Sequence, residues 1–301
     1  IRENILHDYE LDGKNYVYFA FDQMNDYFSA KTILSMFHTE EEIRKYVCEK
    51  VLGIIDGKFK NWGSEDLFTH VCALYAKKFG KECIDIIQSI NDEADRANLF
   101  RIYIESFEWR NKIYLSISEL LKLCNEYSIE PAILWNAFIN NSVKKDHLLN
   151  ADTLYDVLKR YPLAKRDYLW TIFLNGRNTD DDRLIQLIKI YNKGEVFEVS
   201  DKEQIRLLLI LFSWVLTSSN RWLRDTTSKA MIEILKDYFE YTEYLLKLFS
   251  DVNDPYVIQR LYGIVFGACV KRKGKNKERF KSLVCFVFEN VFDKEIVYPD
   301  I

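Results

Sequence analysis

Glycine and proline are scarce in this chain, and their scarcity constrains the fold more than any other feature. The 301 residues include only 10 glycines and 4 prolines, while 48% are hydrophobic. Short strands need turn residues at their ends, whereas long helices joined by short loops need few of them. The composition therefore predicts an all-α protein with a large buried core, built either as one compact domain or as an elongated array.

The beginning of the sequence departs from this helical pattern. Two short β-prone runs, residues 5–11 and 16–19, flank Asp12-Gly13, a dipeptide that supplies the positive φ angles of a tight hairpin. From about Phe21 to Phe37 apolar residues recur at helical spacing. A hairpin that leads into a helix is typical of the edge of a winged-helix module. We therefore expect a short β-hairpin and a winged-helix remnant at this end of the chain.

Three helix starts share a capping box, in which a hydroxyl residue and a glutamate three positions later satisfy unpaired backbone N–H groups. The pairs are Thr39 with Glu42, Ser116 with Glu119, and Ser200 with Glu203. Over residues 202–217 the apolar residues occupy nearly the whole helix circumference, which predicts packing neighbours on several sides. A further start, Asp254-Pro255, combines an N-cap with proline at the first helical position.

Two segments near the C-terminus resemble copies of one unit. Residues 220–225 and 254–260 each open a long helix after a shorter one, and Tyr256 stands 34 positions after Trp222. This offset is close to the period of helical hairpin repeats. The chain is therefore expected to form an α-solenoid of stacked helical hairpins, similar to HEAT or TPR arrays.

The sequence contains no arrangement of residues that is typical of catalysis. Three Gly-Lys pairs lack the Ser or Thr that a phosphate-binding loop requires, and the four histidines are scattered. No two of the six cysteines form a C-x-x-C pair, so most of them are interpreted as reduced core thiols. We expect no enzyme activity, no catalytic or metal-binding residue and no bound cofactor in this chain.

Overall charge selects no class of partner, since the formal net charge is -4 with 29% charged residues. No run approaches the ~20 apolar residues that span a bilayer, so we expect a cytoplasmic protein without a membrane partner. Because the chain begins Ile1-Arg2-Glu3-Asn4, without methionine or an apolar signal core, it is expected to be a piece of a larger protein.

One short run of the sequence is strongly basic. It contains Lys271, Arg272, Lys273, Lys275 and Lys277. Such a run could contact nucleic acid or an acidic partner. The run lacks the interleaved aromatic residues on which bases stack, so a solvated loop and helix face is favoured and nucleic acid is not the expected partner.

Four blocks of sequence stand in a fixed order between residues 18 and 268. They contain Phe19, Phe21, Asp22 and Asp26; then Asp146, His147, Asn150, Arg166, Asp167 and Trp170; then Arg221, Arg224, Asp225 and Lys229; then Asp254, Pro255, Tyr256 and Arg260. Together these blocks resemble the C-terminal region of bacterial STAND NTPases, the signalling ATPases that include the AVAST antiphage proteins. The family usually has proline where this chain has Leu148.

The resemblance implies a division of labour within a larger parent protein. Residues 1–37 would close its NTPase module, and residues 38–301 would form a helical-repeat sensor. ATP and magnesium would bind upstream of this chain, where an effector would also lie. The sensor would recognise a foreign protein, such as a phage structural protein, and promote self-association of the parent in antiphage defence.

Most block residues are expected to be structural. Charged residues at helix starts are expected to cap helices or bridge adjacent repeats, and Trp170 is expected to be a core anchor. The bridging and capping set is Arg224, Asp225, Asp254 and Arg260. Two alternatives stay open: a generic HEAT- or TPR-like scaffold with a host partner and, with less support, an all-helical enzyme.

Overall fold

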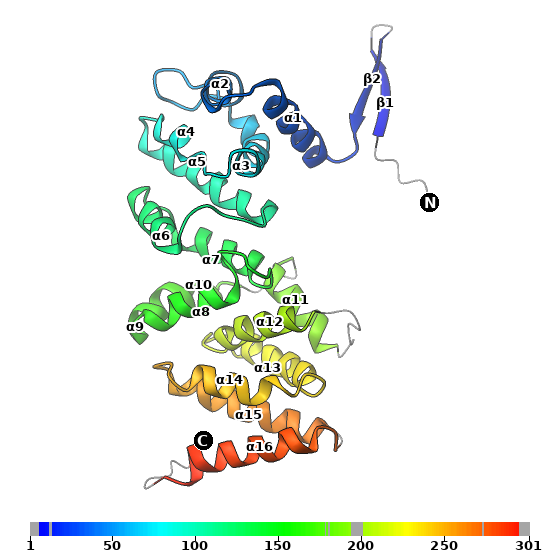
Figure 1. Cartoon of the computed structure of the whole chain (residues 1–301), viewed down its shortest axis with the longest axis vertical. Helices are drawn as coiled ribbons and strands as arrows, with labels where there is room; N and C mark the ends of the chain where they lie inside the picture. The colour runs from blue at the N-terminus through cyan, green and yellow to red at the C-terminus, as the bar shows by residue number, and fades with distance from the viewer. Residues whose placement is uncertain are drawn as a thin grey trace. The chain divides into compact units, whose positions relative to one another are not determined.

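The computed structural model describes residues 6–11, 14–177, 179, 181–193, 201–272 and 274–294 (Figure 1). Within these residues the protein is mostly helical, as the composition predicts. The chain forms two compact units, residues 1–137 with 146–148 and residues 138–145 with 149–301. The boundary expected between residues 37 and 38 stays a prediction. No helix in the described part of the chain has both the length and the hydropathy to cross a membrane.

Unit 1 begins with two antiparallel strands and continues with helices. Its elements are β1 (Leu6–Leu11), β2 (Lys14–Phe19), α1 (Asp22–Met36), α2 (Glu40–Tyr46), α3 (Glu65–Phe79), α4 (Ile84–Gln88), α5 (Glu93–Glu105) and α6 (Ile117–Glu126), with short π or 3-10 segments at Val47–Val51, Trp62–Ser64 and Ser106–Trp109. In the hairpin Leu6 pairs with Phe19 and Leu11 pairs with Lys14. The expected turn, Asp12-Gly13, lies outside the described residues, and the winged-helix assignment stays a prediction.

Two of the three predicted capping boxes are confirmed. At α2 the Thr39 hydroxyl accepts the Glu42 N–H at 3.3 Å, while the Glu42 carboxylate accepts the Thr39 N–H at 3.1 Å. Ser116 and Glu119 form the same box at α6. The third start differs, because Asp201 caps its helix by accepting the Glu203 N–H at 3.0 Å. Ser200 lies outside the described residues.

Helix α3 forms the centre of unit 1 and packs against α1, α5 and the segment after α5. A buried ion pair reinforces this packing, with Arg110 Nη1 2.5 Å from Glu82 Oε2. Arg110 also donates to the Ser106 hydroxyl, and its guanidinium lies 5.0 Å from the Tyr103 ring centroid. These contacts hold the chain that follows α5 against the loop between α3 and α4.

Unit 2 consists of helices throughout its described residues. They are α8 (Ala151–Arg160), α9 (Leu163–Arg166), the π-helical segment η4 (Asp167–Thr171), α10 (Ile172–Asn175), α11 (Arg183–Asn192), α12 (Lys202–Val215), α13 (Arg221–Leu235), α14 (Tyr241–Phe249), α15 (Pro255–Lys271), α16 (Lys277–Val287) and the π-helical segment η5 (Phe288–Phe292). Helix α7 (Pro131–Asn141) contributes residues to both units.

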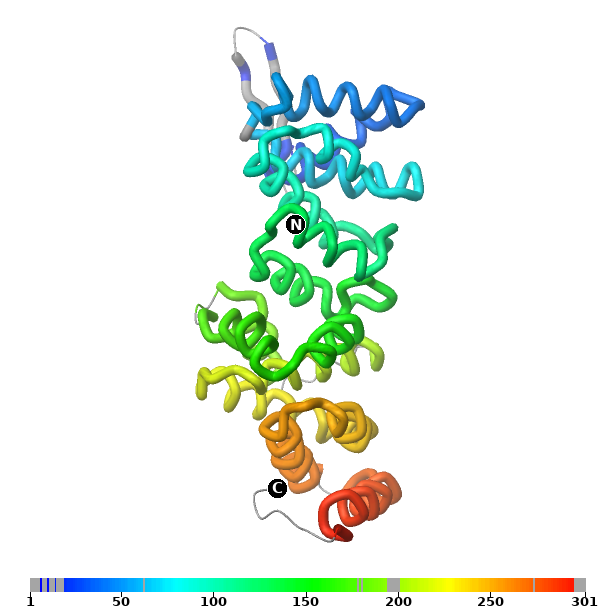
Figure 2. Tube along the Cα trace, turned by 90° about the vertical axis from the view of Figure 1, so that its left-hand side faces the viewer, coloured from blue at the N-terminus to red at the C-terminus, as the bar shows by residue number. Residues whose placement is uncertain are grey.

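Alternate helices of unit 2 pack against one another. Helix α13 packs against α11 and then α15 packs against α13, while α12 contacts α8, α13, α14 and α15 (Figures 1 and 2). Residues 207–215 of α12 are all buried, which confirms that this helix has neighbours on several sides. Helix α16 is tied to α14, since Ser282 donates to Glu243 at 2.8 Å and Arg279 to Glu240 at 2.6 Å. The full solenoid stays a prediction.

Candidate functional site

Residues from two distant sequence blocks meet in a buried ion pair of unit 2. Arg166, at the end of α9, is fully buried and lies 3.2 Å from the Asp254 carboxylate at the start of α15. Its guanidinium also donates to the Asn253 side chain at 2.6 Å and lies 5.3 Å from the Trp214 ring centroid. Asp254 in turn accepts the Val257 N–H at 3.3 Å as the N-cap of α15, which Pro255 opens. One carboxylate therefore both caps α15 and fixes α9 against it.

Trp170 continues this buried framework from the same stretch of chain. Its side chain is fully buried in η4, and its indole N–H donates to the Trp214 carbonyl at 3.0 Å. Asp167, one turn earlier, accepts the Thr171 hydroxyl at 3.0 Å. The expected core position of Trp170 therefore agrees with its geometry.

A second cluster joins the starts of α13 and α15. Arg260 lies 3.2 Å from the Asp225 carboxylate and donates to the Tyr256 hydroxyl at 2.8 Å. The guanidinium groups of Arg224 and Arg260 lie 5.5 and 5.3 Å from the Tyr256 ring centroid. Although burial acts to raise it, hydrogen bonds from Arg260 and Arg221 hold the pKa of Asp225 below its usual range. The cluster bridges two helices and orients the Tyr256 ring.

Next to these contacts lies a group that we name the aromatic–arginine surface. It consists of the exposed residues Tyr168, Ile172, Trp222 and Tyr256 and the half-buried Arg224. Tyr168 is 71% exposed and Trp222 is 48% exposed. Four members, Tyr168, Ile172, Arg224 and Tyr256, line a hollow of about 680 Å³ together with polar residues from the loop after α12. Arg224 donates to the Ser218 carbonyl at 2.7 Å, but its buried Nε has no partner among the described residues.

Sequence reasoning missed two members of this surface, Tyr168 and Ile172. Both lie on the helical stretch that places Trp170 inside, and both point outward. The signal available in the sequence was their spacing. Large apolar residues at positions 168 and 172 share one helix face, opposite a buried residue at position 170. The local sequence around residue 170, however, does not show which of the two helix faces is buried.

The remaining members of the last two blocks are exposed. Arg221 pairs with Asp225 at 3.4 Å on the surface of α13, and Lys229 is exposed on the same helix. Exposed pairs of this kind contribute little to stability. The structure therefore gives neither residue a place in the hollow.

The first block lies in unit 1. Phe19 stacks on Phe28 with ring centroids 5.0 Å apart, whereas Phe21 is exposed. Asp22 opens α1, and Asp26 follows one turn later. Burial and the neighbouring Asp66 raise the pKa of Asp26.

The residues around Leu148 lie in the segment that leads into α8. Asp146 has a positive φ of 58°, and a ring nitrogen of His147 lies 3.2 Å from the Phe107 carbonyl oxygen. Asn150 caps α8 by accepting the Thr153 N–H at 3.1 Å. These geometries are structural.

The basic run connects α15 to α16. Lys271 pairs with Glu233, and Arg272 donates to the Lys275 carbonyl at 2.6 Å with its guanidinium 3.9 Å from the Phe280 ring centroid. Lys275 and Lys277 are exposed, and Lys273 lies outside the described residues. That nucleic acid does not bind here stays a prediction.

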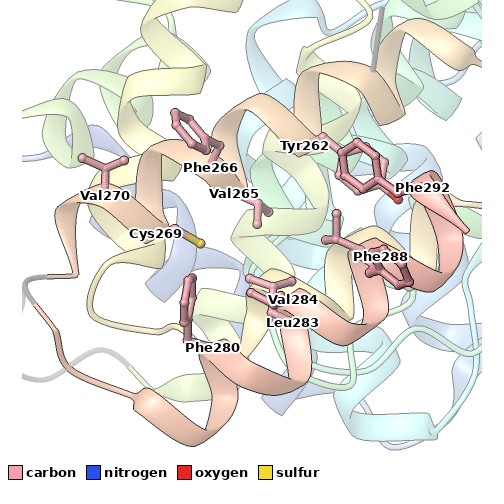
Figure 3. Close-up of a pocket in the computed structure, with 11 residues that line it drawn as sticks. Tyr262, Val265, Phe266, Cys269, Val270, Phe280, Leu283, Val284, Phe288 and Phe292 are labelled. Carbon is pink, nitrogen blue, oxygen red and sulfur yellow. The ribbon is translucent and has the colours of Figure 1, made fainter. Parts of the chain in front are cut away.

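An apolar groove runs between α15 and α16 (Figure 3). Its volume is about 530 Å³, and the residues that line it are aliphatic or aromatic except Cys269. Phe266 and Phe288 remain exposed in it. Sequence reasoning indicated no site at this position.

Metal and thiol chemistry find little support in the described part of the chain. No group of three or more His, Cys, Asp or Glu side chains there could hold a metal ion. Cys72, Cys83 and Cys124 are buried thiols, but the interpretation as core thiols is wrong for Cys285, which is exposed. Burial raises the pKa of Cys124 to about 12, which keeps this thiol protonated and unreactive. The absence of enzyme activity and of a cofactor stays a prediction.

No protein-family model, curated protein or solved structure matches this chain. The resemblance to STAND NTPases therefore depends on the four blocks alone.

A pH effect is expected from His70 on α3, which is buried between the rings of Tyr27 and Trp109. Burial lowers the pKa of His70, although Asp26 and Asp66 act to raise it. As the pH falls through the ordinary value of about 6.5, the unfolded chain gains a proton that the folded chain resists. The free energy of unfolding therefore decreases as the pH is lowered.

Urea unfolding at neutral and mildly acidic pH measures this effect. His70→Gln should reduce the loss of stability on acidification, and His38→Gln, at an exposed position, should leave it unchanged. An equal loss in all three proteins would contradict the assignment.

Proposed function

We propose that this chain is the ligand-sensing C-terminal region of a STAND-type NTPase and that it binds a foreign protein through the aromatic–arginine surface. The observation that carries the proposal is the position of this surface over residues of three of the block segments. Tyr168 and Ile172 flank Trp170 two positions to either side, Trp222 follows Arg221, and Tyr256 follows Pro255.

The chemistry of the surface supports protein recognition. Tyrosine, tryptophan and arginine are the residues that most often carry binding energy in protein interfaces. The buried ion pair and Trp170 beneath them hold the backbone in place, so little ordering is needed on binding. Arg224 lines the hollow, and a guanidinium group is a strong donor for a carbonyl or carboxylate of the bound protein.

The wider proposal concerns the parent protein. A phage structural protein is the proposed ligand, and its binding would favour self-association of the parent, whose upstream module would bind ATP and magnesium. The proposed architecture is a cytoplasmic α-solenoid. The succession of α11, α13 and α15 supports it.

Co-expression with individual phage structural proteins, followed by capture on the tagged chain, tests this function. We expect one class of phage protein to co-purify with the wild-type chain and not with Tyr168→Ala/Trp222→Ala. Trp109→Ala, which removes an exposed tryptophan from unit 1, is the matched control and should still capture it. Capture only of host proteins would favour the scaffold alternative.

A further inference from the structure

We propose that the groove between α15 and α16 binds an amphipathic helix of a partner protein, one with an apolar stripe and with acidic residues at the end nearest the loop between α15 and α16. This contact is separate from the aromatic–arginine surface. The two proposals can therefore fail independently.

The packing of unit 2 defines where such a helix would lie. Helix α15 packs on α13 through Gly267, where an added Cβ would lie 2.7 Å from the Ile232 side chain. The residue 34 positions after Ile232 is Phe266, and it is 71% exposed. Helix α15 covers the face of α13 that bears Ile232. The corresponding face of α15, which bears Phe266, is not covered by any described residue. A helix on that face would repeat the step from α13 to α15.

The size of the groove fits one helix. Phe266, Val270, Val284, Phe288 and Phe292 are each about half exposed or more. At 150–250 Å² for an aromatic side chain, the three phenylalanines alone expose roughly 280–460 Å². This area is already comparable to the largest apolar patch of a typical monomer, about 300–600 Å², and the two valines extend it toward the ~800 Å² that each partner buries in a stable interface.

The charges beside the groove select the flank of the bound helix. No charged side chain lines the groove. Lys275 and Lys277 are exposed in the loop and first turn that lead into α16, and Lys281 is exposed one turn later, near Glu278 at 3.2 Å. Glu289 and Asp293 are exposed beside Phe288 and Phe292, at the other end of the groove. Acidic residues of the bound helix would therefore meet the lysines at the end nearest the loop between α15 and α16, where basic residues would be repelled. A concave groove between two helices also suits a helix better than a flat bilayer surface.

Fluorescence anisotropy with two synthetic helical peptides of about 18 residues, or ~5 turns, tests the proposal. Both carry the same leucine stripe, and the flanking residues of one half of the peptide are glutamate in one and lysine in the other. We expect the acidic peptide to bind the full chain at least ~10-fold more tightly than the basic one. Phe266→Asp and Val284→Asp should each weaken binding at least ~10-fold. Lys275→Glu/Lys277→Glu should reverse the preference.

Two controls accompany this test, and further outcomes distinguish a partner helix from a second copy of the chain or a lipid surface. Tyr168→Ala should leave peptide binding unchanged, which keeps the test independent of the proposed function. Circular dichroism should show an unchanged fold for each groove variant, since the replaced side chains are exposed. The proposal is overturned if neither peptide binds, or if the wild-type chain dimerises through residues removed by Phe266→Asp. Groove-dependent sedimentation with anionic phosphatidylglycerol vesicles, without peptide binding, would also overturn it.

Discussion

Asp254→Ala is expected to lower the free energy of unfolding by about 3–5 kcal/mol, because it leaves the buried Arg166 guanidinium without its counter-ion. The same change removes the N-cap of α15, which contributes a further ~1 kcal/mol. These effects add to one another only in part, since one carboxylate makes both contacts. Urea unfolding followed by circular dichroism measures the loss.

Asp254→Asn is the matched control for the two roles. An asparagine oxygen can still cap α15, but the charge opposite Arg166 is lost. We expect this variant to retain the cap and to lose most of the ion-pair contribution, so it should lie between wild type and Asp254→Ala. If Asp254→Ala unfolds within about 0.5 kcal/mol of wild type, the range of an ordinary surface change, the ion pair does not anchor α9 to α15.

Trp170→Ala should also destabilise the protein strongly, by about 3–5 kcal/mol. The fully buried indole fills the core of unit 2, so its removal leaves a cavity, while the Trp214 carbonyl loses one donor and keeps its bonds from Thr217. Thermal unfolding monitored by circular dichroism checks this. Tyr168→Ala provides the comparison on the same π-helical segment, since its side chain is 71% exposed. That variant should stay within about 0.5 kcal/mol of wild type, and an unchanged melting temperature in Trp170→Ala would remove this residue from the core.

Local features of the fold were predictable from the sequence. The capping boxes at Thr39 and Ser116 involve residues three positions apart, so their chemistry is visible without knowledge of the fold. The apolar circumference of α12 likewise indicated its burial. The prediction placed the cap of α12 one residue early, because serine and aspartate are adjacent at 200 and 201 and either residue type can cap.

Contacts between distant residues could not be predicted in this way. Arg166 and Asp254 are 88 positions apart, and nothing in either local pattern names the other as its partner. The groove between α15 and α16 was also invisible, since a periodic apolar face shows that a helix face can be buried and not whether a neighbour covers it. With only two copies of the repeat unit, the sequence could not show that the face bearing Phe266 would stay open.

The affinity of the captured phage protein for the chain tests the central claim most directly. Titration by isothermal calorimetry should compare wild type, Tyr168→Ala/Trp222→Ala and the Trp109→Ala control. Loss of two central aromatic contacts at about 2 kcal/mol each should weaken binding by at least ~100-fold, with the control unchanged. An affinity of the double variant within a factor of about two of wild type, or ~0.4 kcal/mol, would contradict recognition through the aromatic–arginine surface.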